Sequence, residues 1–159
     1  MYTRILVPLD GSRFAEQALP HALNIAATGA VEIHLLSVAP LLDEQPNAVV
    51  DMYPVYIYRD YMVNNASESE RIKQGLKDYL DQIMKRISGA GHAVVCAIRL
   101  GQPAEEIISY ASENACELIV MSTHGRSGIG RWVYGSVADK ILRGSMTPVL
   151  LVRVQEQTE

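Results

Sequence analysis

A glycine-rich stretch, residues 121–136, has the composition and the position of a phosphate-binding loop. It follows the apolar run 118–121, which predicts a buried strand, and precedes the segment 136–142, which predicts a helix. Glycine lacks a Cβ, so the backbone can adopt positive φ and turn successive N–H groups toward an anion, which the N-terminus of a helix also favours. The stretch therefore predicts a site for a ligand that carries phosphate groups. Its glycines are Gly125, Gly128, Gly130 and Gly135.

Three further side chains of this stretch could contact such a ligand. His124 could touch a phosphate, although a role as a catalytic base is disfavoured. Arg126 could clamp a phosphate or lie solvated on the surface. Ser136, with Asp139 three positions on, predicts the N-cap of the next helix and could also hold a phosphate. Residues 122–147 carry four cationic residues against one anionic, so they form a basic patch in a chain whose net charge is −4.

Composition sets the class of protein. A chain of 159 residues with 48% hydrophobic content predicts one domain over 1–159. The net charge of −4 argues against a nucleic-acid-binding protein. The absence of a secretory signal and of any apolar run of membrane-spanning length predicts a cytoplasmic protein without a membrane partner. Cys96 and Cys116 lack Cys-x-x-Cys spacing, which predicts reduced, buried thiols, and the scattered histidines predict no metal site.

Apolar segments of strand type alternate along the chain with segments of helical periodicity. Strands separated by helices predict an α/β fold, a doubly wound parallel sheet with right-handed crossovers and helices on both faces. Pro20 interrupts the first helical pattern, so we expect a kink or a stepped first turn there. The predicted strands are 5–9, 31–38, 93–100, 118–121 and 149–154, and the predicted helices are 14–26, 72–87, one that opens near 103, and 136–143.

The end of the first strand predicts the other side of the ligand site. In doubly wound sheets, ligands bind beyond the carboxyl ends of the strands, where the winding direction reverses. If the strands 5–9 and 118–121 are neighbours, Pro8, Leu9 and Asp10 line one crevice with the glycine-rich stretch, and Asp10 could accept hydrogen bonds from a ribose or a base. The alternative is that Asp10-Gly11-Ser12 forms only a turn and a helix cap.

A long connection, about 40–65, separates the second strand from the second helix and contains four tyrosines. Connections of this length in compact domains are usually functional or disordered, and the tyrosines argue against full disorder. We expect this segment to fold over the crevice or against a partner subunit.

Three segments resemble the universal stress protein family, and the resemblance covers essentially the whole chain. They are Ile-Leu-Val-Pro-Leu-Asp-Gly-Ser at 5–12, Gly-x-Pro-x-Glu-Glu-Ile at 101–107, and Ser-x2-Gly-x9-Gly-Ser at 122–136. The ATP-binding branch of that family carries Gly-x2-Gly-x9-Gly-Ser/Thr, so Ser122 stands here in place of the first glycine. Serine is small, and we expect binding to survive the replacement.

The resemblance implies a Rossmann-like or flavodoxin-like five-stranded sheet of order 3-2-1-4-5 that binds ATP, with or without Mg²⁺. It also implies a homodimer through the strand 149–154, and an apolar terminal strand left unpaired would be an aggregation hazard. The family's nucleotide contacts fall here on Pro8, Asp10 and Val38 for adenine and ribose, on Met121, Ser122 and Gly125 for ribose and the first phosphates, and on Gly135, Ser136 and Val137 for the distal phosphates.

Three classes of function remain open. The first is a regulatory module of the stress response, in which ATP changes the affinity for a protein partner that the sequence does not identify. The second is a slow ATPase or phosphoryl-transfer enzyme, which the lack of a Gly-x4-Gly-Lys-Ser/Thr motif and of paired acids near the loop disfavours. The third is a nucleotide-free scaffold for dimerisation, against which the glycine spacing argues.

Overall fold

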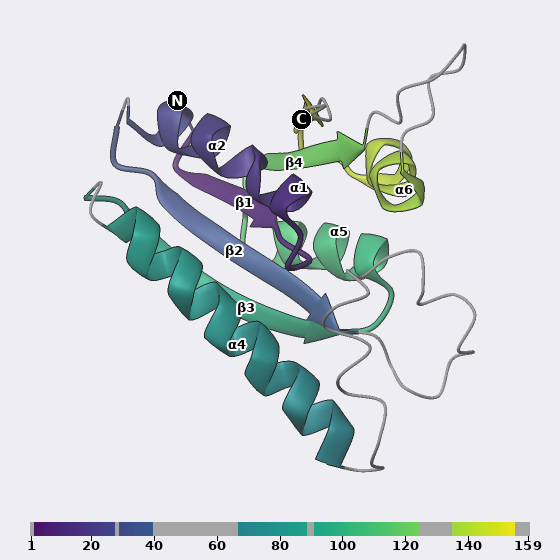
Figure 1. Cartoon of the computed structure of the whole chain (residues 1–159). Coiled ribbons are helices and arrows are strands. Elements are labelled where there is room, and N and C mark those ends of the chain that lie inside the picture. The colour runs from purple at the N-terminus through teal and green to yellow at the C-terminus, as the bar shows by residue number, and fades with distance from the viewer. Residues whose placement is uncertain (1, 28, 40–66, 89–90, 125–134, 155–159) are drawn as a thin grey trace, which may run out of the picture.

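The computed structural model of the chain describes residues 2–27, 29–39, 67–88, 91–124 and 135–154 (Figure 1). The tyrosine-rich connection and the glycines at 125, 128 and 130 lie outside the described residues, so the predictions for them stay predictions.

The core of the fold is a parallel sheet of five strands in the order β3-β2-β1-β4-β5. The central strand β1 reads Arg-Ile-Leu-Val-Pro, and its three aliphatic residues have no exposed surface, as both faces of a doubly covered sheet require. The doubly wound order predicted from the sequence is therefore confirmed. The strands are β1 (Arg4–Pro8), β2 (Glu32–Ala39), β3 (Ala93–Leu100), β4 (Leu118–His124) and β5 (Val149–Val154).

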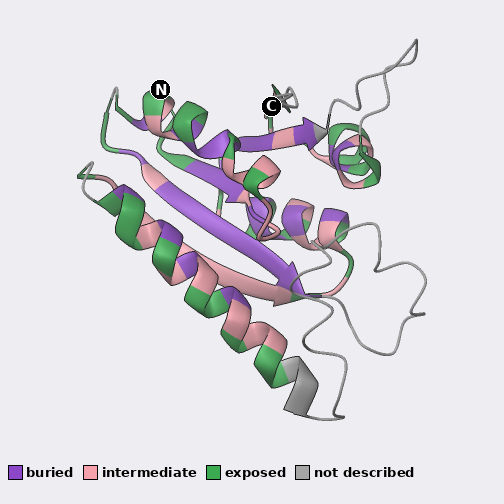
Figure 2. Cartoon of the chain, in the orientation of Figure 1, coloured by how far each residue is buried: buried purple, intermediate pink, exposed green. Residues whose placement is uncertain are grey.

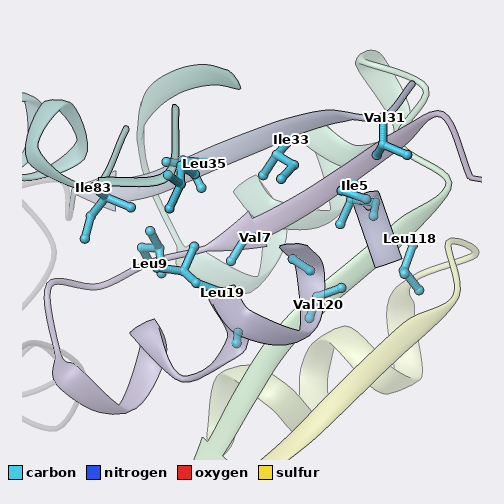
Figure 3. Close-up of a cluster of buried hydrophobic side chains, with 14 of the residues drawn as sticks. Ile5, Val7, Leu9, Leu19, Val31, Ile33, Leu35, Ile83, Leu118 and Val120 are labelled. Carbon is cyan, nitrogen blue, oxygen red and sulfur yellow. The ribbon is translucent and has the colours of Figure 1, made fainter. Parts of the chain in front are cut away.

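Helices cover both faces of this sheet (Figures 1 and 2). Residues of α2 and α4 pack with Ile5, Val7 and Val120 on one face (Figure 3), and residues of α5 and α6 pack with Leu6 and Ile119 on the other. None of the described helices is both long enough and apolar enough to cross a membrane. The helices are α1 (Arg13–Glu16), α2 (Ala18–Ala26), α4 (Ser67–Ile87), α5 (Pro103–Glu113) and α6 (Ser136–Gly144).

The first helical segment is divided into two helices, as Pro20 predicted. The short helix α1 ends at Glu16, and α2 begins at Ala18. Proline has no N–H to donate to the carbonyl four residues earlier, and its ring clashes with that carbonyl, so a continuous helix is unfavourable at this point. The step leaves α1 as a separate turn directly after β1.

The strand β4 runs three residues beyond the apolar segment from which it was predicted. Ser122, Thr123 and His124 continue the strand because each is paired with a residue of β5. Pairing with a neighbouring strand thus extends β4 through polar residues, and it carries the end of β4 to the edge of the sheet where ligands bind in this class of fold.

The two cysteines are free thiols. Cys116 is buried, and burial raises the pKa of its thiol to about 11, so it stays protonated near neutral pH. Cys96 is only half-buried, which departs from the prediction that both are buried.

A buried histidine links the sheet to α5. His34 is 4% exposed; its Nδ1 lies 2.9 Å from the hydroxyl of Tyr110, and its Nε2 lies 2.7 Å from Oε1 of Glu32. A carboxylate can only accept, so in the neutral ring Nε2 donates to Glu32 and Nδ1 accepts from the Tyr110 hydroxyl. Burial raises the pKa of Tyr110, which keeps its hydroxyl protonated and able to donate.

We predict that Tyr110→Phe lowers the free energy of unfolding by about 1–3 kcal/mol, because it leaves a buried ring nitrogen without a partner. Urea denaturation followed by circular dichroism measures the change. Tyr2→Phe, at an exposed tyrosine, is the matched control and should change stability by less than about 0.5 kcal/mol. Equal effects of the two substitutions would contradict the assignment.

Candidate functional site

A cavity of about 170 Å³ opens at the carboxyl ends of β1 and its neighbour β4, the pair of strands at which the order of the strands reverses its direction across the sheet. Of the thirteen residues that the sequence predicts for the site, nine line this cavity. They are Pro8, Leu9, Asp10, Val38, Met121, Ser122, Gly135, Ser136 and Val137.

The other four predicted residues are not placed by the structure. Gly125, Arg126 and Gly128 lie outside the described residues. His124 is the last residue of β4, and its side chain also lies outside what the structure describes. Their proposed contacts with a ligand therefore stay predictions.

The sequence analysis did not predict all the residues that line the cavity. The helix α5 contributes Pro103 and Ile107, and the strand β2 contributes Leu36, two residues before the predicted Val38. The signal was present, since alternate residues of a strand share a face and a helix that follows a parallel strand begins at the same edge of the sheet. The remaining residues that were missed are Ser12, Ala15, Thr123 and Ala138.

The loop between β1 and α1 presents Asp10 to the cavity. Oδ1 of Asp10 accepts a hydrogen bond of 2.9 Å from the N–H of Ser12, and the positive φ of Gly11, 84°, allows the chain to turn between them. Oγ of Ser12 accepts from the N–H of Ala15 at 3.1 Å and caps α1. The turn and the cap are thus both present, and the residues that form them also line the cavity.

The helix α1 is fixed on its far side by α4. Oε2 of Glu16 lies 2.7 Å from the guanidinium of Arg86, and Oε1 of Glu16 accepts from the hydroxyl of Tyr79 at 3.3 Å. Burial and the neighbouring Glu16 raise the pKa of Tyr79, so this hydroxyl remains a donor. The part of the cavity wall that α1 forms is therefore fixed by its contacts with α4 as well as by its connection to the sheet.

The N-terminus of α6 differs from the prediction. The N-cap is Gly135, with φ −56° and ψ 153°, and Ser136 is the first helical residue, so the prediction of a Ser136 N-cap was wrong. Asp139 does not complete a capping box; its carboxylate pairs with Nε of Arg143 at 2.9 Å. No side-chain hydrogen bond caps α6, and this helix end lines the cavity, so its first N–H groups can bind an anion.

Neither the backbone conformation nor the packing at position 135 requires a glycine there. Its φ and ψ are available to any residue, and a Cβ added there would meet no atom of the described residues within 4 Å. A glycine at such a position suits a site where a ligand approaches the backbone closely.

Thr123 carries a buried hydroxyl without a hydrogen-bond partner. The residue is 8% exposed and lines the cavity, and its Oγ1 is the one buried side-chain oxygen or nitrogen of the described residues that is left unpaired. A hydroxyl in this state costs free energy, which a polar group of a ligand could recover.

The cavity combines two chemistries. Apolar side chains from β1, β2, β4 and α5 form one part of its lining. This part suits a flat apolar ring system such as a nucleobase. Asp10, Ser12, Ser122, Ser136 and the first turn of α6 form the other part, which suits hydroxyls and phosphates. Within the described ranges, no three or more His, Cys, Asp or Glu residues are grouped so that they could hold a metal ion.

Comparisons with known proteins agree with this architecture. Universal stress protein MJ0531 of Methanocaldococcus jannaschii is 30% identical over 155 residues, which span 96% of this chain and 83% of that protein. The solved structure of MJ0577 from the same organism superposes with a TM-score of 0.75 at 27% identity, covering 99% of each chain.

A more distant member of the same fold is a universal stress protein family protein from Arabidopsis thaliana, solved with AMP bound. It superposes with a TM-score of 0.64 at 14% identity, over 97% of this chain and 93% of that one, and at this identity the likeness shows the fold alone. The profile of the universal stress protein family matches residues 1–153. With that match over nearly its whole length, the chain belongs to the universal stress protein family.

Proposed function

We propose that this protein is a regulatory module that binds ATP at the carboxyl ends of β1 and β4. The observation that carries the proposal is the junction of an apolar cavity with a helix end that no side chain caps, at a glycine whose Cβ position is open. A nucleotide needs both kinds of surface, because its base is apolar and its phosphates are anionic. The Arabidopsis protein, which shares this fold, was solved with AMP bound, and we propose an adenine nucleotide as the ligand here as well.

Each part of the cavity then has a role. Val38 lies against the adenine ring, Met121 lies against the ribose, and Asp10 accepts hydrogen bonds from ribose hydroxyls. The first N–H groups of α6, with the Ser136 hydroxyl, hold the phosphates, whose charge the helix dipole favours. His124, Gly125, Arg126 and Gly128 complete the phosphate cradle in this proposal.

Binding without efficient turnover is the favoured mode. Rapid phosphoryl transfer needs a lysine or metal ions on the phosphates and a group that orients the nucleophile. Among the residues described around the cavity, Asp10 is the one carboxylate and no lysine or arginine takes part. Slow hydrolysis of ATP, with or without Mg²⁺, is the alternative.

We further propose a homodimer formed through β5. In the described sheet β5 is the last strand, and Leu150, in that strand, is 37% exposed. Met146, in the turn before β5, is 99% exposed, and Leu142 of α6 is 40% exposed. An apolar surface along a sheet edge suits a second copy of the same edge. The two free cysteines fit a reducing compartment, and we propose the cytoplasm.

We predict that ATP at a hundredfold excess over its Kd raises the melting temperature by about 5–10 °C, because a ligand specific to the folded state adds about 2.7 kcal/mol at that ratio. Differential scanning fluorimetry measures the shift. Gly135→Val should fold normally, since its Cβ position is open, and should lose most of the shift because the side chain enters the space of the phosphates.

The matched control for this prediction is Lys140→Val, which places the same side chain at an exposed position of α6 away from the cavity and should keep the full shift. An unliganded wild-type protein that ATP does not stabilise would favour the nucleotide-free scaffold. Single-turnover hydrolysis well above that of Gly135→Val would favour the ATPase.

For the dimer, we predict that the wild-type protein sediments at twice its chain mass at micromolar concentration and that Leu150→Lys sediments as a monomer. A lysine at the interface would be buried without a partner, whereas at an exposed edge it is tolerated. Analytical ultracentrifugation measures both masses. Glu105→Lys, on α5, introduces the same residue away from β5 and should leave the mass unchanged. A monomeric wild type would contradict the proposal.

A further inference from the structure

Ser37 is a fully buried polar residue in the strand β2. It has no exposed surface, and its neighbours along the strand, Leu36 and Val38, are buried apolar residues. A hydroxyl in such surroundings is unfavourable unless it is hydrogen-bonded. Oγ of Ser37 donates to the carbonyl oxygen of Leu9 at 2.7 Å.

The Leu9 carbonyl is the last backbone group before the ligand-facing loop. Leu9 lies one residue beyond β1, and its N–H still donates to the carbonyl of Leu36 at 2.8 Å. Its carbonyl belongs to the planar peptide group that joins Leu9 to Asp10. The hydroxyl of Ser37 therefore fixes the orientation of the peptide group from which Asp10 departs.

The orientation of this peptide group determines where the Asp10 side chain enters the cavity. One carboxylate oxygen, Oδ1, is taken by the N–H of Ser12, which sets the direction of the side chain. The other oxygen has no hydrogen-bond partner among the described residues, and Asp10, Ser12 and Ala15 all line the cavity. Three hydrogen bonds, joined by the covalent chain of residues 9–12, thus link Ser37 in the core of the sheet to Asp10 and to the cap of α1.

We propose that Ser37 is a positioning residue for ligand binding, which acts by holding the Leu9 carbonyl so that Asp10 presents its free carboxylate oxygen to the nucleotide. The proposal rests on the proposed function of ATP binding. Without the hydroxyl, the Leu9 carbonyl is buried and unsatisfied, and the peptide group rotates toward another donor. Asp10 then loses its direction, although Ser37 itself touches no ligand.

The test compares ATP affinities, measured by isothermal titration calorimetry, for four forms of the full chain: wild type, Ser37→Ala, Asp10→Ala and the double variant. Ser37→Ala should weaken ATP binding roughly tenfold, the loss expected when one hydrogen bond to a charged group is misdirected. Asp10→Ala should weaken it at least as much. Because Ser37 acts through Asp10, the double variant should bind no more weakly than Asp10→Ala alone.

The matched control is Ile33→Val, which removes a buried methyl group from the same strand without touching the cavity. It should bind ATP as the wild type does, and urea denaturation of each variant records the stability that is lost. A general effect of destabilisation would weaken binding in this control as well.

A second variant covers the case in which Ser37→Ala does not fold. Ser37→Cys keeps nearly the same volume and offers a weaker S–H donor, so its affinity should fall between those of the wild type and Asp10→Ala. Wild-type affinity in the folded Ser37 variants, or a loss that adds in full to that of Asp10→Ala, would overturn the positioning role. If the wild-type protein does not bind ATP at all, the proposed function itself fails instead.

Discussion

Parallel pairing of β1 between β2 and β4 is the constraint on which the rest of the structure depends. Leu6 of β1 is in register with His34 of β2 on one side and with Ile119 of β4 on the other. Because all three strands run in the same direction, their carboxyl ends meet at one edge, where the loop after β1 faces the start of α6. This pairing brings the residues of the proposed ligand site, which are far apart in the sequence, into one cavity.

Burial of both faces of the sheet explains which residues form the strands and why the few polar ones matter. Ser37, His34 and Thr123 are the buried polar residues of the described chain. Ser37 and His34 have partners, and these tie β2 to the loop after β1 and to α5. Thr123 has none, and it is the one of the three that lines the cavity. Two of the three buried polar residues thus join elements of the fold, and the third lines the cavity.

Local patterns predicted the strands, the helices and the division of the first helix, whereas the order of the strands and most of the predicted cavity wall came from the resemblance to the universal stress protein family. Apolar runs such as Ile5 to Val7 identify buried strands, and Pro20 is tolerated in the first turn of α2 but disfavours a helix that continues through it from α1. The cap of α6 was predicted wrongly because a serine and an acid three residues apart also occur inside a first turn, and Asp139 pairs with Arg143 instead. The partner of the Ser37 hydroxyl and the unpaired hydroxyl of Thr123 depend on tertiary packing, which no local pattern records.

The most direct test of the account follows backbone amide resonances of ¹⁵N-labelled protein while ATP is added. The account predicts that, among the described residues, the large shifts fall on the cavity lining: residues 9–12 after β1, residues 135–138 at the start of α6, and the neighbourhoods of Val38 and Met121. Shifts that leave both segments unchanged at saturating ATP, or that concentrate on the opposite edge of the sheet, would contradict it.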